Sequence, residues 1–244
     1  MTALLNSDST QLQILRTYTI LNQLRPDWGG GLILSLGLDS QGAALSIAAN
    51  IVGAVSLAID NNPIHIREIF RTGACDFVVN TLDEAIRAMK NEARKHAPLS
   101  VALNADPFLA LAEIIKRGLG PQLFSTFLHT LTSEQTHILS QTVNQFQSQG
   151  ASLIDFTDQP DPDPFTSSNT LLAALITERH WTLQTHSFET TAALRVFDTQ
   201  ALSLLSPEDT LRRRWLEAAP RILQRERPPR RALWLTDQES AILL

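Results

Sequence analysis

The sequence predicts an α/β fold with a parallel, doubly wound sheet and a smaller C-terminal α/β region packed on it. Short apolar runs alternate with helix-length segments between residues 30 and 128, with short connections, as is typical of such sheets. The first run, residues 32–36, is almost wholly apolar, as expected of a central strand buried on both faces. All ten glycines lie at or before Gly150, so a glycine-rich phosphate loop can occur only in the first part.

The composition restricts the class of protein. Of the 244 residues, 43% are hydrophobic and 18% are charged, which excludes a disordered chain or a coiled coil. The net charge of −5 argues against a protein that wraps nucleic acid. The single cysteine, Cys75, excludes an internal disulfide framework and a zinc site with several thiolates. The polar N-terminus lacks the apolar segment of a secretory signal, so we expect a cytoplasmic protein.

Residues 40–59 carry no charged side chain, and their length alone would permit a membrane span. Gln41, Asn50 and several serines interrupt this stretch, and Gly53 divides it. A buried helix followed by a buried strand explains the pattern better, so we expect no membrane contact.

The first half of the chain contains apolar runs that we expect to form strands, over residues 32–36, 55–59, 77–79, 100–103 and 123–127. Residue spacing and residue type also predict the helices that precede or join these strands. Residues 11–24 carry apolar side chains at helical spacing. Small residues over 43–52 predict a helix that packs closely on a sheet and ends at Gly53.

The next three helices have recognisable first residues. Pro63 suits the first position of a short helix, and Thr81 with Glu84 forms a capping box for a helix that reaches about residue 96. Asp106 and Pro107 open a helix that Gly118 ends. Ligands on parallel sheets bind at the carboxyl ends of the strands. The segments of interest are therefore 37–42, 60–65, 104–106 and the chain after residue 127.

The later part of the chain is less regular. We predict helices over residues 133–148, 170–178 and from about 206, and strands over 152–156 and 232–235, whereas residues 180–205 stay ambiguous. Residues 236–239 read as a further capping box. The predicted division is an N-terminal helix and lead-in (1–29), the sheet domain (30–130) and a C-terminal region (131–244) with a linker near 157–168.

The turn after the first strand has the outline of a dinucleotide-binding loop. Gly37 and Gly42 occupy the first and third glycine positions, and Asp60 follows the second strand where the ribose-binding acid belongs. The candidate NAD-binding residues are therefore Gly37, Leu38, Gly42 and Asp60. Asp60 is equally well explained as a cap of its strand end.

Asp39 stands where the second glycine belongs. A carboxylate about 4 Å from a phosphate charge costs about 4 kcal/mol at an effective dielectric of about 20, or about three orders of magnitude in affinity. The favoured interpretation is a Rossmann-like turn that no longer holds a dinucleotide, which makes NAD a doubtful cofactor.

The first half of the chain resembles the central NAD-binding domain of urocanase (urocanate hydratase). The resemblance is carried by Gly37-Leu38, AANIVGA (48–54), Asp60, TGACD (72–76), LDEA (82–85), SVAL (100–103) and EIIKRGLGP (113–121). Weaker similarity continues over 147–156 and from 214 to 234, so it covers most of residues 28–240 but not the long flanking parts of the full enzyme. The resemblance implies a Rossmann-like domain whose NAD⁺ acts as an electrophile toward the urocanate imidazole, so that water adds and imidazolonepropionate forms.

Most functional motifs of the family are altered here. Its phosphate loop has the form G-L-G-G-M-x-G, whereas Asp39, Ser40 and Ala43 replace glycines. Asp60 corresponds to the ribose acid, and His65 replaces an arginine. The counterparts of the family's G-N, Q-T-S-x-H-D, Y-G-N-N and G-L-G-D-R motifs lie at residues 105–106, 127 onward, 156–159 and 236–240, and none of them is kept.

The losses fall on ligand-facing loops, while apolar core positions match. We therefore expect a degenerate urocanase homologue without hydratase activity that acts as a binding or partner module, with no catalytic residue assigned. One alternative is an NAD-dependent urocanate hydratase, a lyase of histidine degradation, completed by another subunit. Another is a binder or enzyme for a different small nucleotide or imidazole ligand. A homo-oligomer or a partner protein fits each of these, whereas nucleic acid does not.

Other candidate sites have plain structural explanations. The six histidines form no pair at helical spacing, so no metal is expected, and no G-x-S-x-G elbow occurs. Cys75 reads as a buried thiol, and Trp215 and Trp234 read as core residues. Eight arginines and two glutamates lie between Leu211 and Arg231. This cluster indicates either an anionic partner or a solvated helix surface.

Overall fold

A computed structural model describes residues 7–157, 164–223 and 227–243 of the chain. Its elements in the larger lobe are α1 (Ser7–Leu24), β1 (Leu32–Leu36), α2 (Ser40–Val52), β2 (Val55–Asp60), α3 (Pro63–Thr72), β3 (Phe77–Val79), α4 (Leu82–Arg94), β4 (Leu99–Asn104), α5 (Pro107–Lys116), β5 (Leu123–Thr126), α6 (Ser133–Ser148), β6 (Ser152–Asp155), β7 (Thr166–Ser167) and α7 (Ser168–Arg179). Those of the smaller lobe are β8 (Thr182–Ser187), α8 (Thr191–Leu204), α9 (Thr210–Ile222), β9 (Arg230–Leu235) and α10 (Asp237–Leu243).

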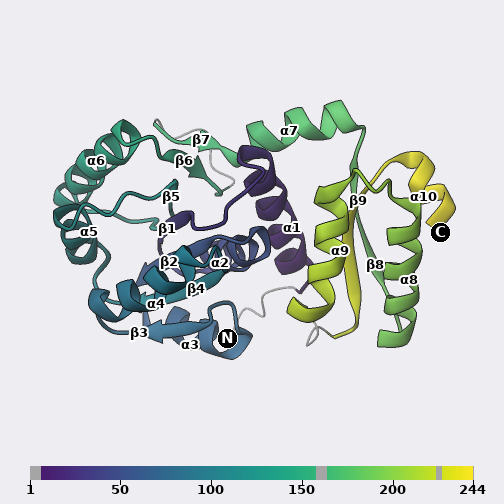
Figure 1. Cartoon of the computed structure of the whole chain (residues 1–244), viewed down its shortest axis with the longest axis horizontal. Helices are drawn as coiled ribbons and strands as arrows, with labels where there is room; N and C mark the ends of the chain where they lie inside the picture. The colour runs from purple at the N-terminus through teal and green to yellow at the C-terminus, as the bar shows by residue number, and fades with distance from the viewer. Residues whose placement is uncertain (1–6, 158–163, 224–226, 244) are drawn as a thin grey trace.

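The larger lobe is built on a seven-stranded sheet in the order β3-β4-β2-β1-β5-β6-β7 (Figure 1). Neighbouring strands are parallel throughout the sheet. The chain moves outward from β1 through β2 on one side and through β5 on the other, so the strand order reverses between β1 and β5. The predicted doubly wound parallel sheet is confirmed, and its ligand-binding crevice belongs at the carboxyl ends of these two strands.

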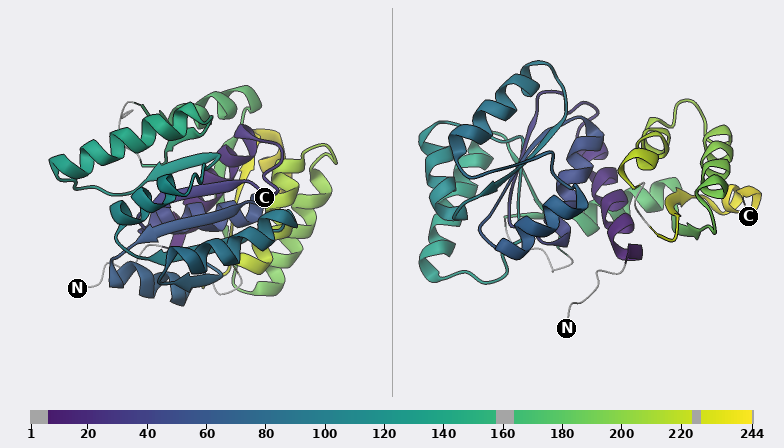
Figure 2. Two further views of the ribbon diagram at one scale, coloured as in Figure 1. Left: turned by 60° about the vertical axis from the view of Figure 1, so that its left-hand side comes forward. Right: turned by 90° about the horizontal axis from the view of Figure 1, so that it is seen from below.

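Helices cover both faces of the sheet, as the view along the sheet in Figure 2 shows. One apolar cluster joins the sheet to α1 and α2, and another joins the opposite face to α4, α5 and α6. Helix α2 packs closely because Ala44, Ala48 and Ala49 are small and fully buried. The Ser100 hydroxyl of β4 reaches the Ser46 carbonyl of this helix at 2.9 Å.

The predicted helix boundaries follow from capping chemistry. Thr81 and Glu84 form the reciprocal capping box at the start of α4, and Pro63 occupies the first turn of α3. Gly53, at φ 85°, ends α2. None of the helices described is long and apolar enough to cross a membrane.

The smaller lobe contains the antiparallel pair β8–β9 with α8, α9 and α10 beside it (Figure 1). The ambiguous residues 180–205 thus form one strand and one helix. On the edge of β9 that faces away from β8, side chains of α1 and α9 bond the backbone of the strand. Gln11 of α1 accepts from the Ala232 N–H and donates to the Arg230 carbonyl, and the Trp215 indole donates to the Ala232 carbonyl at 2.8 Å. These contacts join the lobes through α1.

The sheet continues past residue 130 through β6 and β7. The predicted division into 1–29, 30–130 and 131–244 stays a prediction. Of the predicted linker at 157–168, residues 158–163 lie outside the described residues, and β7 and the start of α7 occupy its end.

Candidate functional site

The turn between β1 and α2 lies at the carboxyl end of the central strand, where the sequence predicts the dinucleotide loop. Gly37 has a φ of 90°, which side chains other than glycine rarely adopt. A Cβ on Gly42 would lie 2.4 Å from the Gly37 carbonyl oxygen. The first and third glycines therefore keep the two roles that the fold itself requires, a tight turn and a close approach of helix to strand.

Asp39 occupies the second glycine position and caps α2. Its Oδ1 accepts hydrogen bonds from the N–H groups of Gln41 and Gly42, at 3.0 and 2.9 Å. Its Oδ2 lies 3.4 Å from Nε2 of His129, which follows β5. A helix N-terminus binds phosphate through such free N–H groups, and here a carboxylate of the chain already holds two of them.

Asp60 ends β2 beside the same turn, and its carboxylate is almost fully buried. Oδ2 accepts from the Leu38 N–H at 2.6 Å and contacts Nδ1 of His65 at 2.7 Å, whereas Oδ1 accepts from the Asn62 N–H at 2.7 Å. Asp60 therefore caps the end of its strand and also stands where the ribose-binding acid belongs. Both oxygens hold internal partners, so a ribose hydroxyl would have to compete with them.

Phe127 follows β5 and packs against the turn between β1 and α2. Its side chain is 3% exposed and belongs to the apolar core. A Cβ on Gly37 would meet the Phe127 Cβ at 3.1 Å, and a Cβ on Gly42 would meet its ring at 3.2 Å. The Phe127 N–H also bonds the Leu36 carbonyl at 2.7 Å. This residue lies where the family's motif after the fifth strand is missing, and the sequence alone gives no sign that its ring turns inward.

The other predicted ligand positions have local partners. Asp106 caps α5 by accepting from the N–H groups of Phe108 and Leu109, at 3.0 and 2.9 Å. The Asn104 amide bonds Asn80 at 3.1 Å. Phe156 is buried after β6, and residues 158 and 159 of that motif lie outside the described part.

The arrangement does not fit a bound dinucleotide. The two first-turn N–H groups that would hold a diphosphate face Asp39, and the carboxylate in the place of the ribose acid is internally paired. Gly37, Leu38, Gly42 and Asp60 stay predicted ligand residues, and the structure gives each of them a role within the fold.

Other reactive side chains are accounted for as well. Burial raises the pKa of the Cys75 thiol to about 12, so it is protonated near neutral pH and a poor nucleophile. Across the described ranges, no three His, Cys, Asp or Glu side chains gather as a metal site would require.

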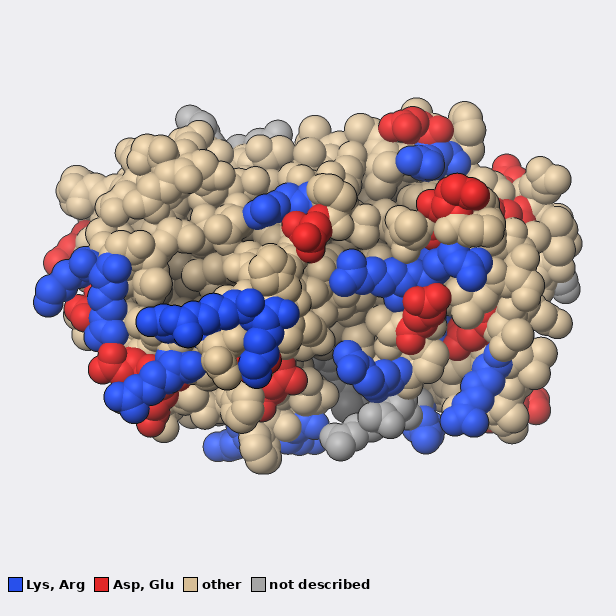
Figure 3. Space-filling view, viewed as in Figure 1, with Lys and Arg blue, Asp and Glu red and all other residues tan. Residues whose placement is uncertain are grey.

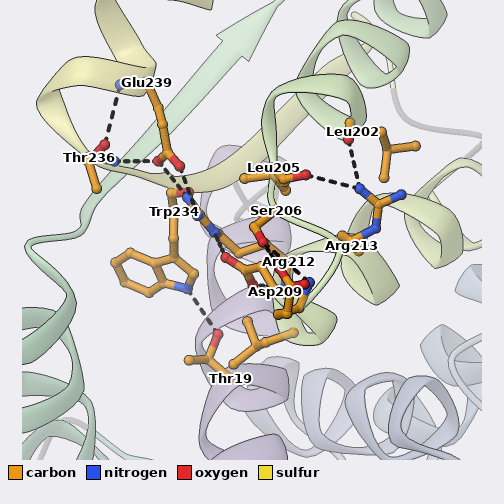
Figure 4. A network of polar contacts seen from close by, with 12 residues as sticks. Thr19, Leu202, Leu205, Ser206, Asp209, Arg212, Arg213, Trp234, Thr236 and Glu239 are labelled. Carbon is orange, nitrogen blue, oxygen red and sulfur yellow. Dashed lines mark hydrogen bonds and ion pairs between the residues drawn. The ribbon is translucent and has the colours of Figure 1, made fainter.

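The arginine cluster does not form a purely solvated helix surface. Arg212 donates to Asp209 and to both carboxylate oxygens of Glu239, and also to the Trp234 carbonyl (Figure 4). The expectation of solvated arginines is wrong for Arg212, which is 6% exposed, because neighbouring elements supply carboxylates and a carbonyl oxygen.

Two further arginines of this cluster have internal partners. Arg213 donates to the carbonyls of Leu202 and Leu205 at the end of α8. Arg231, 1% exposed, pairs with Asp198 through two hydrogen bonds. Trp215 and Trp234 are buried as predicted. On the face shown in Figure 3, acidic side chains lie among the basic ones.

The comparisons with known proteins bear on this geometry. A sequence model of the urocanase Rossmann-like domain matches residues 10–138, more than half of the 244-residue chain. The chain belongs to the urocanase family. The match spans β1 to β5 and the turn that holds Asp39. The weaker resemblance to urocanase after residue 138 stays a prediction.

Among solved structures, the chain is similar to a short-chain alcohol dehydrogenase from E. coli CFT073 complexed with NADH. The alignment covers 96% of this chain and 61% of that chain, at 11% identity and a TM-score of 0.36. A likeness this remote carries no argument about the cofactor of this urocanase-family chain.

Proposed function

We propose that this urocanase-family chain lacks NAD-dependent hydratase activity and serves as a binding or partner module. The observation that carries the proposal is the Asp39 carboxylate on the first-turn N–H groups of α2. It occupies the donors that a diphosphate would need and places a negative charge where the diphosphate would lie.

Sterics support the same conclusion. Phe127 is packed against Gly37 and Gly42, so the turn could widen toward β5 for a diphosphate only by displacing a buried aromatic side chain. Truncating such a side chain costs about 3–5 kcal/mol in a well-packed core. Moving it from the core into water would remove a comparable stabilisation.

The second candidate is an NAD-dependent urocanate hydratase. Asp60 favours it, because a carboxylate still stands at the end of β2 where the ribose acid belongs. Its partners must be exchanged before it can bind a ribose, and His65 would have to turn away.

The absorbance spectrum of the purified full chain, followed by calorimetric titration with NAD⁺, distinguishes the two. We expect no co-purified nucleotide and no binding at millimolar NAD⁺. With NAD⁺ present, the ultraviolet absorbance of urocanate should stay unchanged. Stoichiometric bound NAD, or loss of the urocanate absorbance, would overturn the proposal.

The variant Asp39→Gly tests the charge directly. We expect it to raise the affinity for NAD⁺, because the removed repulsion is worth about 4 kcal/mol at about 4 Å, although Phe127 keeps binding weak. The matched control is Asp83→Gly, which removes an exposed carboxylate from the first turn of another helix of the same lobe, α4. Equal NAD⁺ affinity in both variants would show that Asp39 does not block the site.

A further inference from the structure

We propose that His186 makes the smaller lobe sensitive to acid, because a proton added to its imidazole loosens the packing of α8 on β8 and β9. His186 lies on β8, where it is the cross-strand partner of Arg231 on β9. Side chains at such positions point to the same face of the strand pair, and α8 packs on that face through Phe197 and Asp198. His186 belongs to the smaller lobe, so this device works independently of the proposed function.

The surroundings of the half-buried His186 ring suit a neutral imidazole. The ring centroid lies 4.9 Å from that of Phe197, which is 5% exposed and contacts Phe188 at 5.1 Å between ring centroids. The Nε2 atom is inaccessible to solvent and has no hydrogen-bond partner among the described residues. A charged imidazole carries a hydrogen on both nitrogens. Protonation would therefore leave a buried N–H without an acceptor, which is costly.

Charge repulsion acts in the same direction. Arg231 is 1% exposed, and its Nε and Nη2 donate to the two carboxylate oxygens of Asp198 at 2.7 and 2.8 Å. Like charges at directly opposite positions of an antiparallel pair destabilise it. An imidazolium at His186 would add a second positive charge to a site whose one acid already holds Arg231.

The other charged side chains of these elements do not offset this repulsion. Arg195 of α8 and Glu189, which follows β8, are exposed. Arg230 is next to Arg231 in β9, so its side chain points to the opposite face of the strand pair. Across the described ranges, no ion pair joins His186 to a carboxylate. In agreement with this geometry, burial lowers the pKa of His186.

A histidine whose folded pKa lies below its unfolded value loses stability in acid. As the pH falls, the unfolded chain, with an ordinary histidine pKa of 6.5, binds the proton first. The stability that depends on the neutral imidazole is therefore fully present above pH 6.5 and falls progressively below it. Because the contact joins β8 to α8, we expect these two elements to open before the parallel sheet of the larger lobe.

Hydrogen exchange of the full chain, followed by mass spectrometry and corrected for the intrinsic exchange rate at each pH, tests this proposal. Between about pH 7.5 and pH 5.5 we expect the protection of β8 and α8 to fall at least about threefold, while that of β1 and β4 stays constant. His186→Phe keeps an aromatic ring against Phe197 and cannot be protonated, so the fall should disappear. The matched control is His180→Asn, which removes an exposed histidine just before β8 and should behave as the wild type.

An NMR titration of the His186 ring in the wild-type chain gives a second readout, which does not require a variant to fold. Its midpoint in the folded protein should lie below the ordinary 6.5. A midpoint at or above 6.5, or constant protection of β8 and α8 over this pH range, would overturn the proposal. An equal loss of protection in the wild type and in His186→Phe would do the same, because another group would then be responsible.

Discussion

The two lobes use charged side chains in opposite ways. In the larger lobe, carboxylates satisfy backbone N–H groups, as Asp39, Asp60 and Asp106 do at the carboxyl ends of the strands. In the smaller lobe, guanidinium groups satisfy carbonyl oxygens and acids, as Arg212 and Arg231 do. In both lobes, residues that look like ligand-binding candidates in the sequence are taken up by the fold.

The difference has a geometric cause. Parallel strands followed by helices gather helix N-termini, and hence free N–H groups, at one end of the sheet. The smaller lobe has instead an edge of β9 and the end of α8, both of which present carbonyl oxygens to α9. Acids suit the first environment and arginines the second.

The largest effect is expected in the smaller lobe, at its most buried ion pair. Asp198→Ala would leave the Arg231 guanidinium, 1% exposed, without its carboxylate, and should lower the free energy of unfolding by about 3–5 kcal/mol. Urea denaturation measures this. Glu217→Ala, at an exposed position on α9, is the control and should change little. The double variant Arg231→Met, Asp198→Leu should recover much of the loss, and a loss as large as in Asp198→Ala would contradict this account.

An intermediate effect is expected in the larger lobe at Gly42. Alanine inside a helix is favoured over glycine by about 1 kcal/mol, but its Cβ would lie 2.4 Å from the Gly37 carbonyl oxygen. Because overpacking costs about 1–3 kcal/mol, Gly42→Ala should lower the thermal midpoint. Ser40→Ala, two residues earlier in α2, serves as the comparison. A raised midpoint for Gly42→Ala would show that the turn has room to move.

The smallest effect concerns pH and the acid that faces Arg212. Burial alone would raise the pKa of Glu239, but hydrogen bonds from Arg212 and Thr236 outweigh it, and the pKa lies below the ordinary 4.5. A carboxyl with a depressed folded pKa contributes stability above pH 4.5 that is lost as the pH falls through the folded value. Unfolding free energies measured from pH 7 to pH 3 should therefore fall more for the wild type than for Glu239→Gln. Parallel curves would show that the pair contributes nothing.

Much of the larger lobe could be predicted because its signals are local. Apolar runs, the capping box at Thr81, Pro63 and the glycines gave the strands, the helices and the parallel order. The first and third glycines of the loop were also recognisable, because both roles depend on backbone geometry. Residues 180–205 carried mixed signals, and their strand forms only because β9, more than 40 residues later, pairs with it.

Whether the candidate NAD site is blocked depends on contacts between distant segments, which could not be predicted from the sequence. The contact of the Phe127 ring with Gly42 and the contact of His129 with Asp39 each join elements that the sequence separates. Asp39 could be recognised as an obstacle from its charge alone, but not as the cap that already holds the N–H groups.

By itself, the sequence determined the fold class, the family resemblance and the acidic substitution in the first turn, because these depend on periodicity, composition and residue type. The tertiary structure alone decided which polar groups find partners within the chain, as Asp39 does at two N–H groups of α2 and Arg212 does at Glu239. Hydrogen bonds and ion pairs depend on distances of about 3 Å, and only folding brings residues far apart in the chain that close.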